Sequence, residues 1–242
     1  MIRKIEGIVI SEQDYKESSK IIKIITKDGI ISIIAKGSRK LKSNLRITTT
    51  KLTYGIFNVY YKEDGLSTLK EVDILNDFKN IKKDINKISY ASYILELASQ
   101  VIKQNKNEEI FLLLVASLNK INENFDPLII TNILELKYLD YLGVMPIIDE
   151  CSLCGSKTSI ATISGRNGGY ICNNCLTNEK IVDEKTIKLI RMFYYVDINK
   201  ISKLEISNKI KMEINDFLDE YYDKYTGLYL KTKSFLKNLN KL

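Results

Sequence analysis

The sequence predicts an α+β protein in two parts: a small five-stranded β-barrel over residues 1–77 and a helical domain over residues 78–242. Three observations lead to this fold class. Five short apolar runs lie before residue 77, helical periodicity begins at Phe78, and all four cysteines lie between residues 151 and 175. With 242 residues, 45% of them hydrophobic, the chain can bury a core. A usual domain size of about 100–200 residues allows one large domain or two small ones.

The barrel is predicted from five runs with strand character. They cover residues 4–11, 20–26, 30–35, 52–61 and 66–72. An Asp28-Gly29 step separates the second run from the third, and such a step between β-branched runs favours a hairpin. Residues 62–65, which end in Gly65, separate the last two runs. Five short strands with no helix-length pattern among them predict a small closed or half-closed barrel.

From Phe78 onward, apolar residues recur at helical spacing. A first series, expected to form one long helix, contains Ile81, Ile85, Ile88, Leu95 and Ile102, and a second contains Ile110, Leu114, Leu118 and Ile121. A third helix is predicted to begin with Asp126 as N-cap and Pro127 in its first turn, and to stop at Gly143. Residues 183–196 and 207–225 return to helical spacing after the cysteines.

The four cysteines form one pattern, Cys151-x2-Cys154 and Cys172-x2-Cys175, within a module at about residues 148–180. Two such hooks, 17 residues apart, match a tetrahedral zinc site, because each hook supplies two thiolates from one tight turn. Two disulfides are disfavoured in a reducing cytosol, and a redox Cys-x-x-Cys needs only one pair. An iron–sulfur cluster is the remaining alternative. A site with four cysteines leaves no open position, so the predicted Zn²⁺ is structural.

Several function classes are excluded. The chain has no histidine, which excludes Ser-His-Asp triads, Cys-His dyads and metal sites that contain histidine. Neither common glycine-rich phosphate-binding spacing occurs. The longest apolar run, residues 110–116, is shorter than the ~20 residues that span a bilayer. Because the first six residues already include charges, we expect no signal peptide and a cytoplasmic protein.

The formal net charge is +7, and two stretches contain basic residues without any acid. Residues 29–62 form the first stretch and residues 224–242 the second. Such local fields attract polyanions, of which nucleic acid is the commonest. The alternative is a solvated lysine-rich surface in a chain that is generally rich in lysine.

The first basic stretch supplies the candidate DNA-binding residues. Four of them follow the third strand in a loop that contains glycine and serine, and two extend the track: Lys36, Arg39, Lys40, Lys42, Arg46 and Lys51. Single strands bind such barrels in a basic groove, with bases stacked on aromatic rings. By alternation, Tyr54 and Tyr60 share one face of the next strand, with Phe57 and Tyr61 on the other. For each tyrosine, core packing and base stacking both remain open.

The order of these motifs resembles the bacterial DNA repair and recombination mediator family RecO. The stretches that carry the resemblance are residues 7–10, 14–20, 25–29, 35–40 with Lys42-Ser43, 134–136 and 141–146, and the two cysteine hooks with Gly155 and Gly168-Gly169. Each is weak alone, but their order over most of the chain is specific. The resemblance implies an N-terminal OB-fold and a helical C-terminal region that carries the zinc module.

The resemblance also implies a function that needs no enzymatic activity. Such a protein binds single- and double-stranded DNA, anneals complementary strands, and helps to load the recombinase onto DNA coated by single-strand-binding protein. Its partners would be RecR, often RecF, and the tail of single-strand-binding protein. Some members carry a basic residue that helps to receive this tail just before the segment corresponding to 134–136. Here the corresponding positions are Asn132 and Ile133, so the chain departs from the family there.

Two rival functions come from other classes. A nuclease needs carboxylates that converge on Mg²⁺, and Asp216, Asp219 and Glu220 are close in sequence. Their i, i+3, i+4 spacing more simply indicates the solvent-exposed face of a helix. The second rival is a protein scaffold, in which the cysteine module is a docking platform and the lysines only confer solubility.

Overall fold

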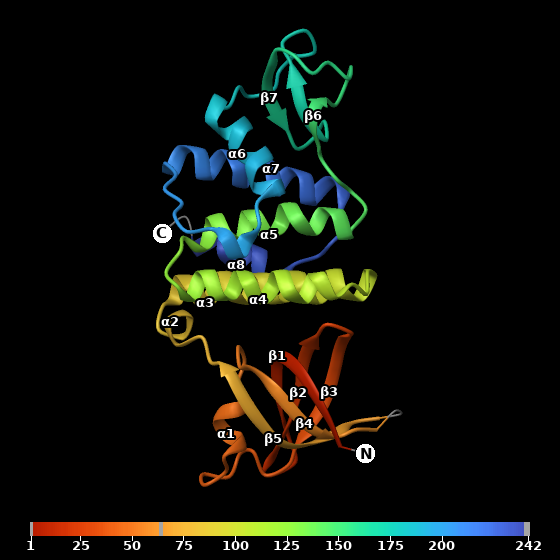
Figure 1. The fold of residues 1–242 in the computed structure, drawn as a ribbon, viewed down its shortest axis with the longest axis vertical. Helices are drawn as coiled ribbons and strands as arrows, with labels where there is room; N and C mark the ends of the chain where they lie inside the picture. The colour runs from red at the N-terminus through yellow and green to blue at the C-terminus, as the bar shows by residue number, and fades with distance from the viewer. Residues whose placement is uncertain (1, 63–64, 240–242) are drawn as a thin grey trace. The chain divides into compact units, whose positions relative to one another are not determined.

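The computed structural model of the chain describes residues 2–62 and 65–239. It divides into two compact units, residues 1–122 and residues 123–242, which run from red to yellow-green and from green to blue in Figure 1. Of the predicted features, the Glu63-Asp64 part of one turn and the terminal Lys241 lie outside the described residues. In the part of the chain that is described, no helix has the length and apolarity needed to cross a membrane.

The predicted five-stranded barrel is present in the first unit. Its strands are β1 (Ile2–Tyr15), β2 (Ser19–Thr26), β3 (Gly29–Ala35), β4 (Tyr54–Tyr60) and β5 (Ser67–Asn76). They close in the order β1-β2-β3-β5-β4, and β4 pairs back onto β1. All pairs are antiparallel except β3 with β5, where Ile33 faces Ser67 and Ile34 faces Thr68. This strand order is that of an OB-fold.

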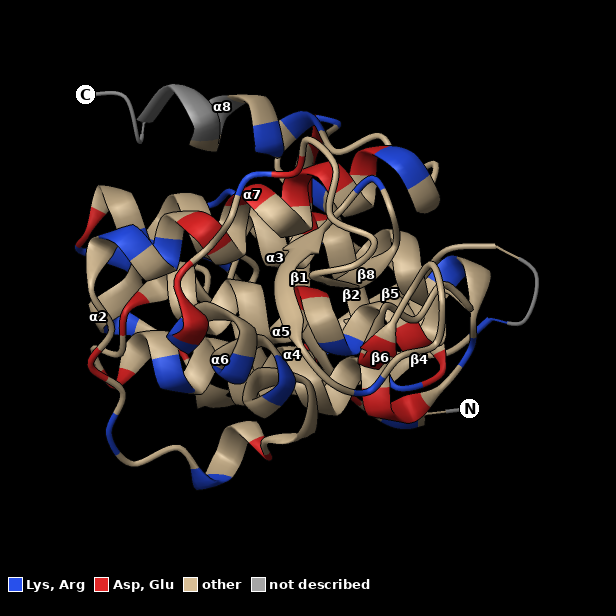
Figure 2. Cartoon of the chain, turned by 90° about the horizontal axis from the view of Figure 1, so that it is seen from above, with Lys and Arg blue, Asp and Glu red and all other residues tan. Residues whose placement is uncertain are grey.

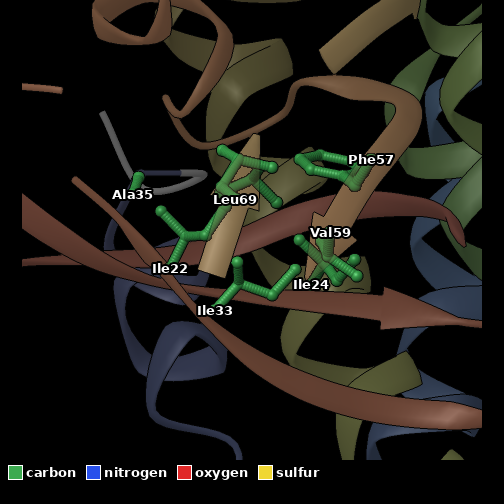
Figure 3. Packing of buried hydrophobic residues seen from close by; sticks show 8 residues of the cluster. Ile22, Ile24, Ile33, Ala35, Phe57, Val59 and Leu69 are labelled. Atoms are coloured by element: carbon green, nitrogen blue, oxygen red, sulfur yellow. The ribbon is translucent and has the colours of Figure 1, made fainter. Parts of the chain in front are cut away.

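The alternating isoleucines and valines of these strands form the barrel core. Ile22 and Ile24 of β2, Ile33 of β3, and Phe57 and Val59 of β4 are fully buried, and Figure 3 shows their side chains directed into one cluster with Ala35 and Leu69. Each strand thus turns one face inward, as its period of two requires. Ala35, the last residue of β3, belongs to this core, so the connection from β3 to β4 begins at residue 36.

The helices of the first unit are α1 (Leu45–Thr48), α2 (Lys79–Lys82), α3 (Ile85–Gln104) and α4 (Glu108–Asn122). The single long helix expected from the Ile81–Ile85–Ile88 spacing is wrong at its start, because the chain breaks between α2 and α3. Asp84 has extended backbone geometry there, and its carboxylate accepts hydrogen bonds from the backbone N–H groups of Asn86 and Lys87. Asp84 is therefore the N-cap of α3.

The second unit contains α5 (Pro127–Tyr141), α6 (Glu184–Tyr195), a 3-10 turn η1 (Ile198–Lys200), α7 (Asn208–Tyr225) and α8 (Lys231–Leu239). Asp126 caps α5 as predicted, since its carboxylate accepts from the N–H groups of Leu128 and Ile129. α8 has no counterpart among the predicted elements. The unit also holds a sheet of β6 (Ile147–Cys151), β7 (Ile160–Ser164) and β8 (Gly169–Cys172), in the order β6-β8-β7.

Candidate metal centre and nucleic-acid interface

The small sheet of the second unit positions the four cysteines. Cys151 is the last residue of β6 and Cys172 the last residue of β8. Because these two strands are parallel neighbours, their carboxyl ends meet at one edge of the sheet. Cys154 and Cys175 follow three residues later, each in the turn that leaves its strand. The four thiols therefore come from one edge and its two turns.

Local backbone geometry shapes this edge. Gly155 has a φ of +73° and donates its N–H to the carbonyl of Cys151 at 2.9 Å, which closes the first hook. Cys175 donates its N–H to the carbonyl of Cys172 at 3.1 Å and closes the second. At Gly169, a Cβ atom would lie 2.0 Å from the carbonyl oxygen of Ile147. Only glycine allows β6 and β8 to approach this closely.

The sulfur atoms have the spacing that a tetrahedral metal ion requires. All four Sγ atoms lie within 4.8 Å of one another, and the cysteines are free thiols. The Sγ atoms of Cys154 and Cys172 are 3.6 Å apart. Four thiolates about 2.3 Å from a central zinc ion would be about 3.8 Å apart. The donor set and its dimensions therefore fit a Zn²⁺ ion, and an S₄ set also suits an iron–sulfur centre.

The thiols differ in how readily they ionise. Burial opposes ionisation of Cys151, but N–H groups of Cys172, Leu153 and Cys154 donate to its sulfur and lower the pKa of this thiol to about 6. Hydrogen bonding with Cys154 and Cys172 raises the pKa of Cys175 to about 12. The cluster thus favours a thiolate at Cys151 and opposes ionisation of Cys175. A dication removes that opposition, so binding of a metal would release protons.

Contacts with α6 and α7 hold the module in place. The hydroxyl of Tyr170 in β8 donates to the carbonyl of Ile187 at 2.6 Å. Arg191 of α6 pairs with Asp149 of β6 at 2.8 Å and lowers the pKa of that carboxyl. Glu213 of α7 is buried and accepts from the Thr186 hydroxyl at 2.5 Å. The sheet, α6 and α7 therefore form one connected structure within the second unit.

All six candidate DNA-binding residues lie in what we call the basic loop, residues 36–53 between β3 and β4. Turns follow Ala35, then α1, which Figure 1 shows beside the barrel strands. The loop is tied to the β1–β2 hairpin, since Gly37 donates its N–H to the Ser19 hydroxyl at 3.3 Å and Arg39 donates its N–H to the Ser18 carbonyl at 2.9 Å. The Ser38 side chain is fully buried. These hydrogen bonds and the buried Ser38 side chain fix the start of the loop to the barrel.

The six predicted cations have different environments. Four are exposed and form no ion pair with any residue that the structure describes: Lys36, Lys40, Lys42 and Arg46. Arg39 is exposed but pairs with Asp14 at 3.2 Å. Lys51 is half-buried, and its Nζ donates to the Ser92 hydroxyl on α3 at 3.1 Å. Burial lowers the pKa of Lys51. The structure brings the first four together in one loop and turns Lys51 toward α3.

The aromatic residues of β4 follow the predicted alternation. Phe57 lies in the core cluster. Tyr61, the residue after the end of β4, is partly buried and packs against this cluster. Tyr54 and Tyr60 face outward. The ring of Tyr54 is stacked on Phe78 with centroids 6.4 Å apart, whereas Tyr60 is 49% exposed. Of these four rings, Tyr60 is therefore the one most open to solvent.

The carboxylates considered for a nuclease have basic partners instead. Asp219 pairs with Lys233 at 3.0 Å, Glu220 with Arg166 at 3.9 Å, and Asp216 with Lys180 at 4.0 Å. Over residues 2–62 and 65–239, the four cysteines are the one group of potential ligands that gathers closely enough to hold a metal ion. These acids thus form the charged face of α7, red in Figure 2.

Comparison with known proteins agrees with this architecture. The family model described as Recombination protein O N terminal matches residues 1–78, and the one described as Recombination protein O C terminal matches residues 82–234. The DNA repair protein RecO of Listeria innocua is 34% identical over 245 residues, which cover 99% of this chain and 96% of the relative. The DNA repair proteins RecO of Bacillus pumilus and Bacillus subtilis are 34% and 32% identical over 247 residues. Each of these two matches covers 100% of this chain and 96% of the relative. The chain belongs to the RecO family.

Proposed function

We propose that this chain is a non-enzymatic DNA-binding mediator of recombination in DNA repair, active in the cytoplasm at the nucleoid. It binds single- and double-stranded DNA and anneals complementary strands. It also helps to load the recombinase onto DNA coated by single-strand-binding protein. Relatives named DNA repair protein RecO, similar over nearly their whole length, support the repair role.

The observation that carries the proposal is the set of unpaired cations in the basic loop. Lys36, Lys40 and Lys42 are exposed, and no acidic residue occurs between residues 29 and 62. A lysine that faces only water has no internal charge to neutralise, so it can neutralise a phosphate without breaking an ion pair. Arg39 would have to exchange Asp14 for a phosphate. We therefore assign the strongest backbone contacts to the first three residues and Arg46, and weaker ones to Arg39 and Lys51.

This chemistry suits annealing. Cations that contact phosphates screen the repulsion between two strands and leave the base edges free to pair. No nucleotide hydrolysis is required, because pairing itself releases the free energy. The contacts would be largely independent of base sequence.

We infer that Cys151, Cys154, Cys172 and Cys175 hold one structural Zn²⁺. The close spacing of the four sulfur atoms supports this ion. A site filled by four cysteines supplies no catalytic position. When bound, the ion would neutralise the thiolates and fasten the two hooks to one another.

The proposed partners are RecR, RecF and the tail of single-strand-binding protein. In this chain Asn132 and Ile133 of α5 are both buried, and neither is basic. An acidic tail would therefore need another contact on this chain.

The test is annealing of complementary oligonucleotides coated with single-strand-binding protein, with and without the full metal-loaded chain. Wild type should accelerate annealing. The variant Lys36→Ala/Arg39→Ala/Lys40→Ala/Lys42→Ala should lose most of this effect. It should also flatten the plot of log K against log[salt] on single strands by up to about 3 units, because each neutralised phosphate contributes about 0.7.

Lys82, the last residue of α2, and Lys83, which follows it, are both exposed and give a control of equal charge. Arg39→Ala/Lys40→Ala is compared with Lys82→Ala/Lys83→Ala. Equal losses from both pairs would mean that net charge alone matters and would remove the loop's claim. DNA cleavage in the presence of Mg²⁺ would contradict the non-enzymatic role, and salt-independent retention of DNA on filters would contradict binding through phosphates.

A further inference from the structure

Two large aliphatic side chains of the basic loop stand almost fully in water. Leu41 is 84% exposed and Ile47 is 74% exposed, more than any other leucine or isoleucine among the described residues. Exposed leucines are common singly. Here an exposed leucine and an exposed isoleucine occur six residues apart in one loop, and neither takes part in the barrel core.

The loop holds these side chains outward by its construction. On one side of Leu41, Arg39 is bonded to the Ser18 carbonyl, and Ser38 is fully buried. On the other side, the N–H of Leu45 donates to the Ser43 hydroxyl at 3.3 Å, and the Leu45 side chain packs against the core cluster. Within α1, Leu45 thus faces inward while Ile47, two residues on, faces solvent. The exposure follows from a fixed backbone.

Uncompensated positive charge surrounds both side chains. Leu41 lies between Lys40 and Lys42, and Ile47 follows Arg46. None of these three cations forms an ion pair within the described parts of the chain. A ligand that fits such a surface must be anionic and must also offer apolar area at the spacing of its charges.

Single-stranded DNA meets both requirements, because its unstacked bases expose flat apolar faces beside the phosphates. A protein of this barrel type usually supplies aromatic rings for these faces, but the basic loop contains no aromatic residue. Aliphatic side chains serve the same purpose in proteins that insert leucine or isoleucine between bases. Membership in the RecO family makes DNA the polyanion to be considered first.

We propose that Leu41 and Ile47 are base-contacting residues, which press against or between the bases of a single strand while Lys40, Lys42 and Arg46 hold its phosphates. This inference rests on the proposed function and deepens it. The loop then has two kinds of residue. Its cations set the salt dependence of binding, and its aliphatic residues distinguish a strand with unpaired bases from a sugar-phosphate backbone without bases. Bases held apart in this way cannot stack into competing hairpins.

The test is a cycle of two changes, one in the protein and one in the DNA. The full metal-loaded chain and Leu41→Ser/Ile47→Ser are titrated with a fluorescent single-stranded oligonucleotide and with the same oligonucleotide carrying abasic sites at its centre. We expect the variant to bind the intact strand about fivefold to tenfold more weakly, near the lower end of base stacking on a protein side chain. Its salt dependence should equal that of wild type, and on the abasic strand the two proteins should bind alike.

Leu75→Ser/Ile85→Ser is the matched control, because these residues are 53% and 69% exposed in the same unit and lie outside the loop. It should bind both oligonucleotides as wild type does. Equal losses by the loop variant on the intact and abasic strands would overturn the inference, as would an unchanged affinity for the intact strand. Loss of binding to anionic vesicles with DNA binding intact would overturn it as well, and would assign the two residues to a lipid surface. The proposed function fails separately, if removal of the loop cations leaves DNA binding and annealing unchanged.

Discussion

The basic loop and the C-terminal segment look alike in sequence, since both are acid-free stretches rich in lysine. In the structure they differ. Lys233 is 15% exposed and pairs with Asp219 at 3.0 Å and Asp223 at 3.7 Å, and Lys224 donates to the carbonyl of Arg166. Figure 2 shows basic residues of α8 beside the acidic face of α7. Lys40 and Lys42, in contrast, are exposed and form no ion pair with any residue that the structure describes.

A count of charges along a short stretch of sequence therefore does not predict the electrostatic potential at the surface. The acids that neutralise Lys233 lie on another helix, ten or more residues earlier in the chain. The second unit repeats this pattern, since Lys209 pairs with Asp183 at 3.3 Å and Lys211 pairs with Asp126. Lysines in the second unit are thus largely engaged within it, and the basic loop retains its charge for a ligand.

The largest expected effect separates the two units. Removal of the metal with a chelator, or Cys172→Ser, should unfold the module around β6–β8, because structural zinc sites contribute folding free energy directly. DNA binding by the basic loop should survive. Elemental analysis of the purified chain should give one zinc per molecule, and near-ultraviolet circular dichroism should change on chelation while the salt slope of DNA binding does not. Absence of both zinc and iron would refute the metal site.

The next effect tests the comparison itself. Lys40→Ala/Lys42→Ala should flatten the salt slope of single-strand binding by about 1.4 units, because two phosphate contacts are lost. Lys224→Ala/Lys233→Ala removes the same formal charge from residues engaged in the second unit, so the slope should stay near that of wild type. Titration of one oligonucleotide at several salt concentrations measures both. If the second pair flattens the slope equally, the distinction between the two segments is wrong.

The smallest effect is on stability. Lys233→Met should lower the free energy of unfolding by about 1–2 kcal/mol, between the values for exposed and buried pairs, because Asp219 loses its partner. Lys40→Met, which breaks no ion pair among the described residues, should change it by less than about 0.5 kcal/mol. Urea unfolding at pH 7 compares the two variants.

The loss of stability in Lys233→Met should depend on pH. Burial opposes the charge of Lys233, but Glu135, Asp219 and Asp223 outweigh burial and raise its pKa above the ordinary value of 10.5. A raised pKa adds stability that is complete below the unfolded value and is lost as the pH rises through the folded one. The difference between wild type and Lys233→Met should therefore be constant from pH 7 to about pH 9 and shrink above about pH 10.5. A difference that disappears already at pH 8 would contradict the ion pair.

The features that the sequence predicts best are those that a few neighbouring residues determine. The hooks at Cys151 and Cys172 are local, and zinc chemistry fixes their spacing. The strands follow from β-branched alternation, and the N-cap of α5 follows from Asp126-Pro127. Each of these patterns carries its own physical cause within a few residues.

The features that escaped prediction depend on distant partners. Lys51 turns toward α3 because Ser92 lies there, 41 residues away. α3 begins at Ile85, later than predicted, because the Asp84 carboxylate accepts hydrogen bonds from the first N–H groups of the helix. The helical spacing of Ile81 and Ile85 does not reveal this cap. The exposure of Leu41 could not be predicted from the sequence either, because a leucine between lysines can equally be buried and hold its loop against the core.

The closing of the barrel has a kinetic consequence. The β1–β2 and β2–β3 hairpins join neighbouring residues, but β1 pairs with β4 through Ile2 and Tyr60, and β3 reaches β5 through Ile33 and Ser67. Contacts of such long sequence separation form late, because the intervening chain must first lose its freedom. The segment that bridges the early hairpins and the late strands is residues 36–53. We therefore expect its outward-facing side chains to acquire their full arrangement only when β4 and β5 pair, late in folding.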